Sequence, residues 1–286
     1  MTLLLPLLLL LACGDNDGAN DTGADGTGST PDPRPEPPAY SEGTCPELFD
    51  GSFDDFPTGG TSYDLKIVLP PDPQGAPVIF AWHWLGGTAS QIINQMDLDQ
   101  LAADENVIII APNAGSGSVF DWNFLAEPEG NPDLTLFDDL LSCARQQWGI
   151  DLDRVYSMGM SAGGLQTSYL TIHRAEWHAA TAPLSGGVVD GFYFTPDWPL
   201  PVLLTWGGES DNSNGLSFHD AALLLSEELR ADGSFVIECE HTGGHSIPSG
   251  ATEYIWQFFA DHPYGVSPEP YADGLPESFP SWCSIP

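Results

Sequence analysis

The stretch VYSMGMSAGG, residues 155–164, decides the fold of this chain. It begins as a β-rich apolar run and continues into a segment with helical periodicity, so it predicts a strand followed directly by a helix. At the junction, Gly159, Ser161 and Gly163 form a G-x-S-x-G motif. Such a turn exposes the serine hydroxyl above the sheet and directs the N–H of Ala162 toward a developing negative charge. The motif therefore predicts that Ser161 is a nucleophile.

Strands and helices alternate on both sides of this turn. Apolar and β-branched runs predict strands over 63–69, 77–84, 106–111, 155–160, 179–184, 202–206 and 235–239. Apolar residues at helical spacing predict helices over 90–103, 134–148, 162–172, 216–229 and 252–259. The alternation predicts an α/β fold with a mostly parallel central sheet and helices on both faces. The tail after His262 is Pro-rich and is expected to be irregular.

A serine nucleophile needs a base, and the base needs an orienting acid. The strand over 202–206 is followed by GGESD, and we expect Asp211 to be the acid, with Glu209 as the alternative. The last core strand is followed by EHTGGHS, in which two glycines precede His245. We expect His245 to be the base and keep His241 as the alternative.

A second oxyanion donor is expected in the loop after an early central strand, AWHWLGGT over residues 81–88. The backbone N–H of Trp84 or of Leu85 is the candidate, and a Gly-rich turn without a catalytic role is the alternative. Aromatic residues fall in or near the loops expected around the site and are candidates to line a cleft: Trp82, Trp84, Trp122, Phe124, Phe192, Tyr193 and Trp198.

The charge of the chain excludes some partners. It has 41 Asp plus Glu against 6 Lys plus Arg, a formal net charge of −35, over 286 residues of which 42% are hydrophobic. A nucleic-acid partner needs a basic face, and anionic lipid also attracts basic residues, so neither is expected to bind through the charges of this protein. The hydrophobic content is sufficient for a large core and excludes global disorder.

The same charge predicts a response to salt. Self-repulsion destabilises the compact state, and ions screen it over about 10 Å at 0.1 M ionic strength. We expect the thermal unfolding midpoint to rise when sodium chloride is increased to about 1 M, where the screening length falls to about 3 Å. The charge also suits a saline habitat. Thermal melts followed by circular dichroism measure the response, and a midpoint highest in near-zero salt would contradict that hypothesis.

The N-terminus resembles an export signal. Residues 1–13 contain an apolar run too short to span a bilayer, and they end in LLAC, which resembles the lipobox of bacterial lipoproteins with Cys13 as the lipidated residue. No Lys or Arg precedes the run, and an ordinary secretory signal is the alternative. Residues 14–44 are polar, Gly-, Asp- and Pro-rich and are expected to form a disordered tether. Residues 45–286 are expected to form the catalytic domain of an exported protein, either anchored at the cell surface or in the periplasm or released.

Four further cysteines suit an exported chain, in which two disulfides are plausible: Cys45, Cys143, Cys239 and Cys283. Three pairings are possible, and four buried free thiols are the alternative. The spacing contains no CxxC or clustered Cys/His pattern, so no metal is expected, and no cofactor is expected either.

Together these segments resemble the secreted α/β-hydrolases that include polyhydroxybutyrate depolymerases, feruloyl esterases and acetylxylan esterases. The resemblance covers roughly residues 60–262 and is carried by four pieces: the strand ending in His83 with Gly86-Gly87, residues 151–164, GESD over 208–211, and GGH over 243–245 with Pro248. It departs from the family pattern at Trp84, at Trp206 and at Ile247.

The resemblance implies the α/β-hydrolase fold and a triad of Ser161, Asp211 and His245. It implies hydrolysis of a small-molecule or polymeric carboxylic ester of the polyhydroxyalkanoate, feruloyl or acetyl type through an acyl-enzyme. A surface serine peptidase of the same fold and a non-catalytic binding protein on a hydrolase scaffold remain alternatives. The sequence does not decide between acyl and alcohol specificities or between oligomeric states.

Overall fold

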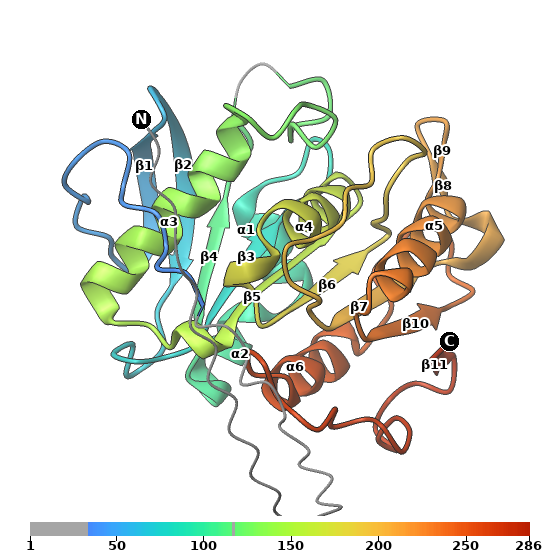
Figure 1. Ribbon diagram of the computed structural model, residues 1–286. Helices are drawn as coiled ribbons and strands as arrows, with labels where there is room; N and C mark the ends of the chain where they lie inside the picture. Colours follow the sequence, from blue (N-terminus) through green and yellow to red (C-terminus); the bar gives the residue numbers. More distant parts are fainter. Residues whose placement is uncertain (1–33, 116–117) are drawn as a thin grey trace, which may run out of the picture. The chain divides into compact units, whose positions relative to one another are not determined.

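The computed structural model describes residues 34–115 and 118–286, and a central sheet of nine strands runs through them (Figure 1). The order across the sheet is β1-β2-β4-β3-β5-β6-β7-β10-β11. The strands are β1 (Gly51–Thr58), β2 (Thr61–Val68), β3 (Val78–Trp82), β4 (Ile108–Pro112), β5 (Val155–Met160), β6 (Ala180–Leu184), β7 (Val202–Trp206), β10 (Val236–Glu240) and β11 (Cys283–Ser284). Neighbouring strands from β4 to β10 are parallel, whereas β1, β2 and β11 join antiparallel at the edges.

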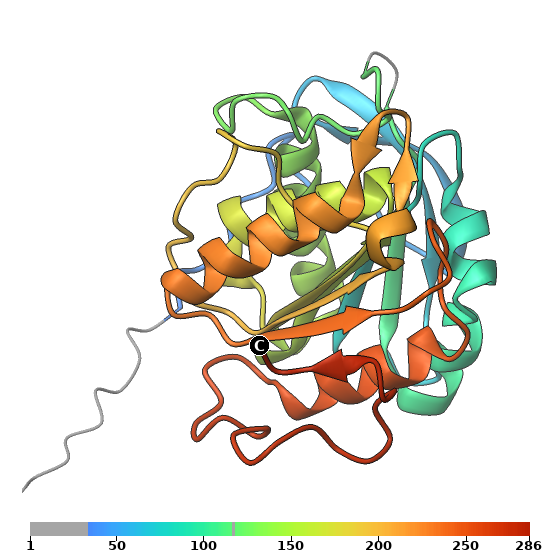
Figure 2. The same ribbon diagram turned by 90° about the vertical axis from the view of Figure 1, so that its right-hand side faces the viewer.

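Helices cover both faces of this sheet, as Figure 2 shows. Core clusters place α3 (Pro132–Trp148), α4 (Ala162–His173) and α5 (Phe218–Ala231) on one face. The other face carries α1 (Ala89–Gln95), α2 (Leu98–Glu105) and α6 (Ala251–Asp261). Every residue of β3 to β7 is buried, as expected for parallel strands with apolar neighbours on both sides. The predicted α/β-hydrolase fold, with a mostly parallel sheet and helices on both faces, is confirmed.

Two predicted helices differ from the structure. The helix expected over 90–103 is two helices, α1 and α2, because Asp97 between them adopts a left-handed conformation with φ of 47°. The helix expected over 216–229 begins only at Phe218, where the side chain of Ser217 caps it by accepting from the N–H of Asp220 at 3.2 Å. The two residues before it belong to a small hairpin of β8 (Asn212–Ser213) and β9 (Leu216–Ser217).

Both ends of the described chain are more ordered than the sequence predicts. The segment 34–44, expected to belong to a disordered tether, lies against the domain. The guanidinium of Arg34 stacks 3.5 Å from the ring centroid of Tyr264, and Tyr40 is buried with its hydroxyl donating to the carbonyl of Pro57 at 2.7 Å. Arg34 and Tyr40 thus hold this stretch against the domain, although its polar overall composition predicts disorder.

Other N-terminal predictions lie outside the described residues. These are the signal segment 1–13 with its lipidation candidate Cys13, and residues 14–33 of the tether. Within the part of the chain that the structure describes, no helix has the length and apolar character needed to cross a membrane.

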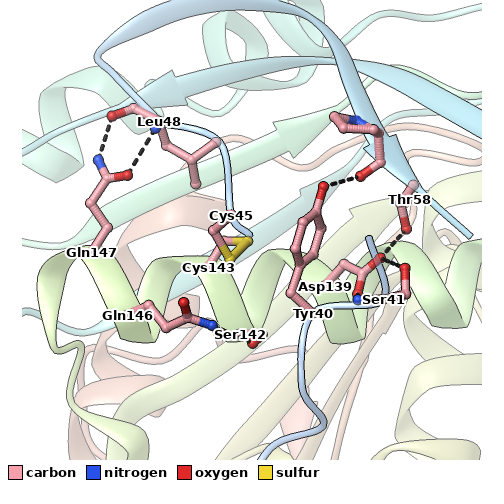
Figure 3. The surroundings of a disulfide bond; sticks show 11 residues. Tyr40, Ser41, Cys45, Leu48, Thr58, Asp139, Ser142, Cys143, Gln146 and Gln147 are labelled. Carbon is pink, nitrogen blue, oxygen red and sulfur yellow. Dashed lines mark hydrogen bonds between the residues drawn. A yellow bond between two sulfur atoms is a disulfide. The ribbon is translucent and has the colours of Figure 1, made fainter. Parts of the chain in front are cut away.

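Two disulfides close the chain onto the sheet and its helices. Cys45 bonds to Cys143 in α3, so the segment before β1 is tied to the helix that covers it (Figure 3). Asp139 of the same helix accepts hydrogen bonds from the hydroxyls of Ser41 and Thr58 at 2.6 and 2.5 Å. A cross-link over a separation of 98 residues removes much conformational freedom from the unfolded chain.

The second disulfide, Cys239 to Cys283, joins β10 to β11. The tail after His262 was expected to be irregular, but it ends in this short antiparallel edge strand. Since β10 leads directly into the loop that carries His245, the cross-link stabilises the edge of the sheet beneath that loop.

A buried histidine connects β5 to the chain before β6. His178 donates from Nδ1 to the carbonyl of Arg174 at 2.8 Å, and its Nε2 accepts from the hydroxyl of Ser157 at 2.8 Å. Burial, with a smaller effect of the charges of Arg34 and Arg174, lowers the pKa of His178 to about 4. The imidazole is therefore neutral in the folded protein.

This predicts acid destabilisation that depends on His178. The unfolded chain binds a proton at the ordinary histidine pKa of about 6.5, and the folded chain binds one only near pH 4. The contribution of His178 to the free energy of unfolding is therefore fully present above pH 6.5. It is lost as pH falls from there toward 4, by on the order of 2 kcal/mol. Urea unfolding at pH 7 and 4.5 should show the stability gap between wild type and His178→Asn shrinking by that amount. A gap independent of pH would contradict the assignment.

Candidate active site

Ser161 occupies the sharp turn between β5 and α4. Its backbone has φ of 60° and ψ of −118°, a conformation that non-glycine residues rarely adopt. The neighbouring backbone approaches so closely that a Cβ on Gly163 would lie 1.9 Å from the carbonyl oxygen of Trp82. Glycine is thus required at position 163 for α4 to start directly against the end of β3. The turn projects the Ser161 hydroxyl into cavities at the carboxyl edge of the sheet.

The structure brings the three side chains of the expected triad into contact. His245 Nε2 lies 2.8 Å from Ser161 Oγ, and His245 Nδ1 lies 2.7 Å from Asp211 Oδ1. The residues are supplied by the turn after β5 and the loops after β7 and β10, at sequence separations of 34 and 84 residues. A neutral imidazole with its proton on Nδ1 donates to the carboxylate and accepts from the hydroxyl. This is the geometry in which an imidazole removes the proton of a serine.

Asp211 is held by two donors besides His245. The side chain is fully buried, and its Oδ2 accepts from the hydroxyl of Ser185 and from the N–H of Gly207, both at 2.8 Å. Burial raises the pKa of Asp211, but the hydrogen bonds from His245, Gly207 and Ser185 outweigh it and bring the pKa below its ordinary value. The carboxylate is therefore charged throughout the neutral range.

Two contacts around the triad were not predicted from the sequence. Ser185 directly follows β6, and this position at the carboxyl edge of the sheet is the signal that could have identified it. The ring of Phe218, at the start of α5, packs 4.6 Å from the ring of His245. No local pattern points to Phe218, because its partner lies in a loop that follows the next strand.

The alternative acid and base lie elsewhere in the same loops. Glu209 is exposed, and its side chain is not among the contacts of His245 in the described chain. The Nδ1 of His241 accepts from the N–H of Gly243 at 3.0 Å, and its ring packs 5.6 Å from Trp282. The structure therefore brings Asp211 and His245, rather than these two residues, to Ser161.

His83 fixes the loop that carries the oxyanion candidates. Its Nδ1 donates to the carbonyl of Trp84 at 2.8 Å, and its Nε2 accepts from the N–H of Ala114 at 3.0 Å. Burial lowers the pKa of His83, so the ring is neutral and can make both bonds. The carbonyl of His83 itself accepts from the indole N–H of Trp122 at 2.9 Å. The His83 side chain thus holds the loop of Trp84 and Leu85 in place through hydrogen bonds.

The oxyanion candidates line the cavities that Ser161 also lines. Ala162 begins α4, where the first N–H groups have no partner within the helix. The N–H groups of Trp84 and Leu85 donate to no group within residues 34–115 and 118–286. Leu85 and Ala162 line one cavity with Ser161, and Trp84 and Leu85 line a second one with it.

The first cavity, called the apolar cavity below, has a volume of about 270 Å³. Its wall carries no Asp, Glu, Lys or Arg among the described residues, although the chain as a whole is strongly acidic. The second, called the open cavity, has a volume of about 440 Å³, and His245, Gln95 and Ser246 contribute to its wall.

The predicted aromatic residues divide between the site and the core. Phe124 and Phe192 line the apolar cavity, and Trp84 lines the open cavity. Trp82 and Trp122 are buried against each other, with ring centroids 5.1 Å apart. The other two lie outside both walls: the hydroxyl of Tyr193 donates to Asp232, and Trp198 stacks on Tyr264.

Comparisons with known proteins agree with this fold. No protein-family model matches the chain. The oxidized polyvinyl alcohol hydrolase of Sphingopyxis sp. (strain 113P3) is 24% identical and aligns with 82% of this chain and 85% of its own length. A probable feruloyl esterase C of Aspergillus clavatus is 27% identical, with 68% of each protein aligned.

Solved structures show the same architecture. A structure named sOPH superimposes with a TM-score of 0.67 at 21% identity, covering 85% of this chain and 97% of that one. The acetyl xylan esterase from Aspergillus awamori superimposes with a TM-score of 0.58 at 14% identity, covering 73% and 98%. The fold is that of the α/β-hydrolases, and the named relatives support carboxylic ester hydrolase activity for this chain.

Proposed function

We propose that this chain is an exported serine esterase that hydrolyses carboxylic esters, of the polyhydroxyalkanoate, feruloyl or acetyl type, through an acyl-enzyme on Ser161. The observation that carries the proposal is the continuous contact from the Asp211 carboxylate through the His245 imidazole to the Ser161 hydroxyl. An apolar cavity opening onto the same hydroxyl supports it.

The reaction proceeds in two balanced steps. In the first, Ser161 Oγ attacks the ester carbonyl carbon while His245 Nε2 takes the hydroxyl proton, and Asp211 stabilises the resulting imidazolium. The tetrahedral oxyanion is bound by the N–H of Ala162 and by that of Trp84 or Leu85, and one such donor is worth about 3 kcal/mol. The bond between carbonyl carbon and alcohol oxygen then breaks, and the imidazolium protonates the leaving alkoxide.

In the second step, water attacks the acyl carbon of the ester formed with Ser161. His245 takes a proton from this water, and the new tetrahedral intermediate collapses with Ser161 Oγ as the leaving group. The imidazolium returns the proton to Ser161, and a carboxylic acid leaves. The net change is one ester and one water converted to one alcohol and one acid.

A fluorophosphonate probe tests the nucleophile directly. The probe should attach to Ser161, identified by mass spectrometry of the peptide that contains it, because only a serine activated by a base reacts at a useful rate. Ser161→Ala is the control for labelling at other positions. Absence of label on the folded protein would contradict the proposal, and faster cleavage of blocked peptides than of esters would favour a surface peptidase.

We also infer that the chain is exported as a lipoprotein modified at Cys13. The motif LLAC at residues 10–13 and the two disulfides of the domain support this inference. Labelled palmitate fed to an expressing bacterium should be incorporated into the wild type and not into Cys13→Ser. Equal labelling of both forms would contradict the inference.

A further inference from the structure

Two cavities of different chemistry meet at Ser161. The apolar and open cavities share four residues: Leu85, Ser161, Ser213 and Asn214. Two of these belong to the β8–β9 hairpin or its turn, which rises directly after Asp211 and lies near the start of α5 (Figures 1 and 2). The hairpin therefore stands where the two cavities divide.

The imidazole contributes to the wall of only one of these two cavities. His245 lines the open cavity, while Phe218, whose ring packs on the imidazole, lines the apolar cavity. The aromatic ring thus separates His245 from the interior of the apolar cavity. Ser161 lines both cavities, so each of them can take one half of an ester bound there.

The chemistry of the leaving group decides which half lies where. The imidazolium delivers its proton to the alcohol oxygen, so this oxygen must leave on the side that His245 faces. We propose that the open cavity binds the alcohol portion of the substrate and that the apolar cavity binds the acyl portion, selecting neutral acyl groups of medium size. This assignment rests on the function proposed above.

The wall of the apolar cavity sets the class of acyl group. Aliphatic and aromatic side chains dominate it, including Leu165, Val188, Phe124 and Phe192. A volume of about 270 Å³ leaves room for an acyl chain of several carbon atoms. An acyl chain ending in a carboxylate would place an unpaired charge there, which an apolar site strongly disfavours.

A pair of matched esters tests the charge selection. Ethyl hexanoate and the monoethyl ester of hexanedioic acid have the same ester group and chain length, and only the second carries a terminal carboxylate at pH 7.5. We expect the wild type to prefer the hexanoate by at least about 100-fold in kcat/KM, because the carboxylate must be desolvated without a partner. Equal rates on the two esters would overturn the proposed acyl pocket.

A charge placed in the cavity provides a gain-of-function test. Leu125 lines the apolar cavity and is 43% exposed, so lysine is tolerated there without burying a charge on folding. Leu125→Lys should raise the ratio of hexanedioate to hexanoate hydrolysis by about tenfold or more through pairing with the carboxylate. Because this variant gains a reaction, misfolding does not imitate the expected result, and an unchanged ratio counts against the proposal.

Filling each cavity in turn tests which half of the ester it binds. Val189→Trp narrows the apolar cavity and should lower kcat/KM for ethyl hexanoate relative to ethyl acetate by about tenfold, with little change between alcohols. Gln95→Trp narrows the open cavity and should discriminate against hexyl acetate relative to ethyl acetate. Leu223→Trp, at an exposed position on α5 outside both walls, is the matched control that changes neither ratio.

The outcomes separate this proposal from the function on which it rests. No hydrolysis of any of these esters by the wild type, with no label on Ser161, would refute the esterase function itself. If Val189→Trp instead changed the discrimination between alcohols and Gln95→Trp that between acyl chains, the esterase function would stand and the assignment of the two cavities would be reversed. Hydrolysis with no effect of either variant on its ratio would refute the assignment altogether.

Discussion

Replacing Ser161 by alanine is expected to lower kcat for ester hydrolysis by about a millionfold. In the proposed mechanism Ser161 Oγ is the only triad atom that bonds to the substrate carbon, so its loss removes the acyl-enzyme path entirely. The oxyanion donors and the apolar cavity remain and should leave slow hydrolysis, about a thousandfold above the uncatalysed reaction. A pH-stat or chromogenic ester assay on protein freed of wild-type contamination measures the loss.

The three side chains of the proposed triad are expected to act as one unit, so the losses from replacing them should not add. His245→Ala is expected to cost about as much as Ser161→Ala, and the double variant no more than either. Ser157→Ala is the matched control, because Ser157 lies on β5, the strand that leads into Ser161, but contacts His178 instead of His245. This control should lose stability and keep activity. Losses that multiply in the double variant would contradict a shared proton relay.

The parts of the site that the sequence predicts are those governed by local geometry and chain order. The turn at Ser161 requires glycine where α4 meets β3, and the G-x-S-x-G motif supplies it at Gly163. The acid and the base follow in order after later strands, and the parallel sheet brings the ends of those strands to one edge. The sequence therefore predicts Ser161, Asp211 and His245, and leaves Glu209 and His241 open as alternatives.

Contacts between side chains from different loops could not be inferred in this way. Ser185 supports Asp211 only because β6 lies beside β7 in the sheet. Phe218 reaches His245 because the β8–β9 hairpin returns the chain to Asp211, whose carbonyl accepts from the N–H of Phe218 at 2.9 Å. Neither the hairpin nor the strand order is encoded in the periodicity of apolar residues, which reports only burial.

Apolar periodicity reports burial alone, which also explains where the predicted helices and strands differ from the structure. The apolar spacing continues through Ile92, Met96 and Leu98, so periodicity does not reveal that Asp97 turns the chain into a second helix. Gly, Asp and Pro in GSFDDFPT conceal β1, which tolerates them because it is an edge strand paired on one side only. Tertiary contacts decide where a helix or strand ends when its end carries a buried polar residue or a residue in the left-handed conformation.

Replacing Asp211 by asparagine is expected to lower kcat by about ten thousandfold. Asparagine can fill the same space, but its amide turns an N–H group toward Nδ1 of His245 and favours the wrong tautomer, in which Nε2 carries the proton and no longer accepts from Ser161. The same change removes the negative charge that stabilises the imidazolium. The effect should fall on kcat more than on KM, since neither cavity wall includes Asp211.

Two further variants make this result specific. Glu209→Gln removes a neighbouring carboxylate that is exposed, and it should change kcat less than about twofold because water already screens that charge. Ser185→Ala removes one of the donors that lower the pKa of Asp211, so it should weaken activity at the acid end of the pH profile more than at pH 8. Activity falls at the acid end because a carboxyl group with a higher pKa becomes neutral at a less acidic pH. A large loss in Glu209→Gln with normal activity in Asp211→Asn would transfer the orienting role to Glu209.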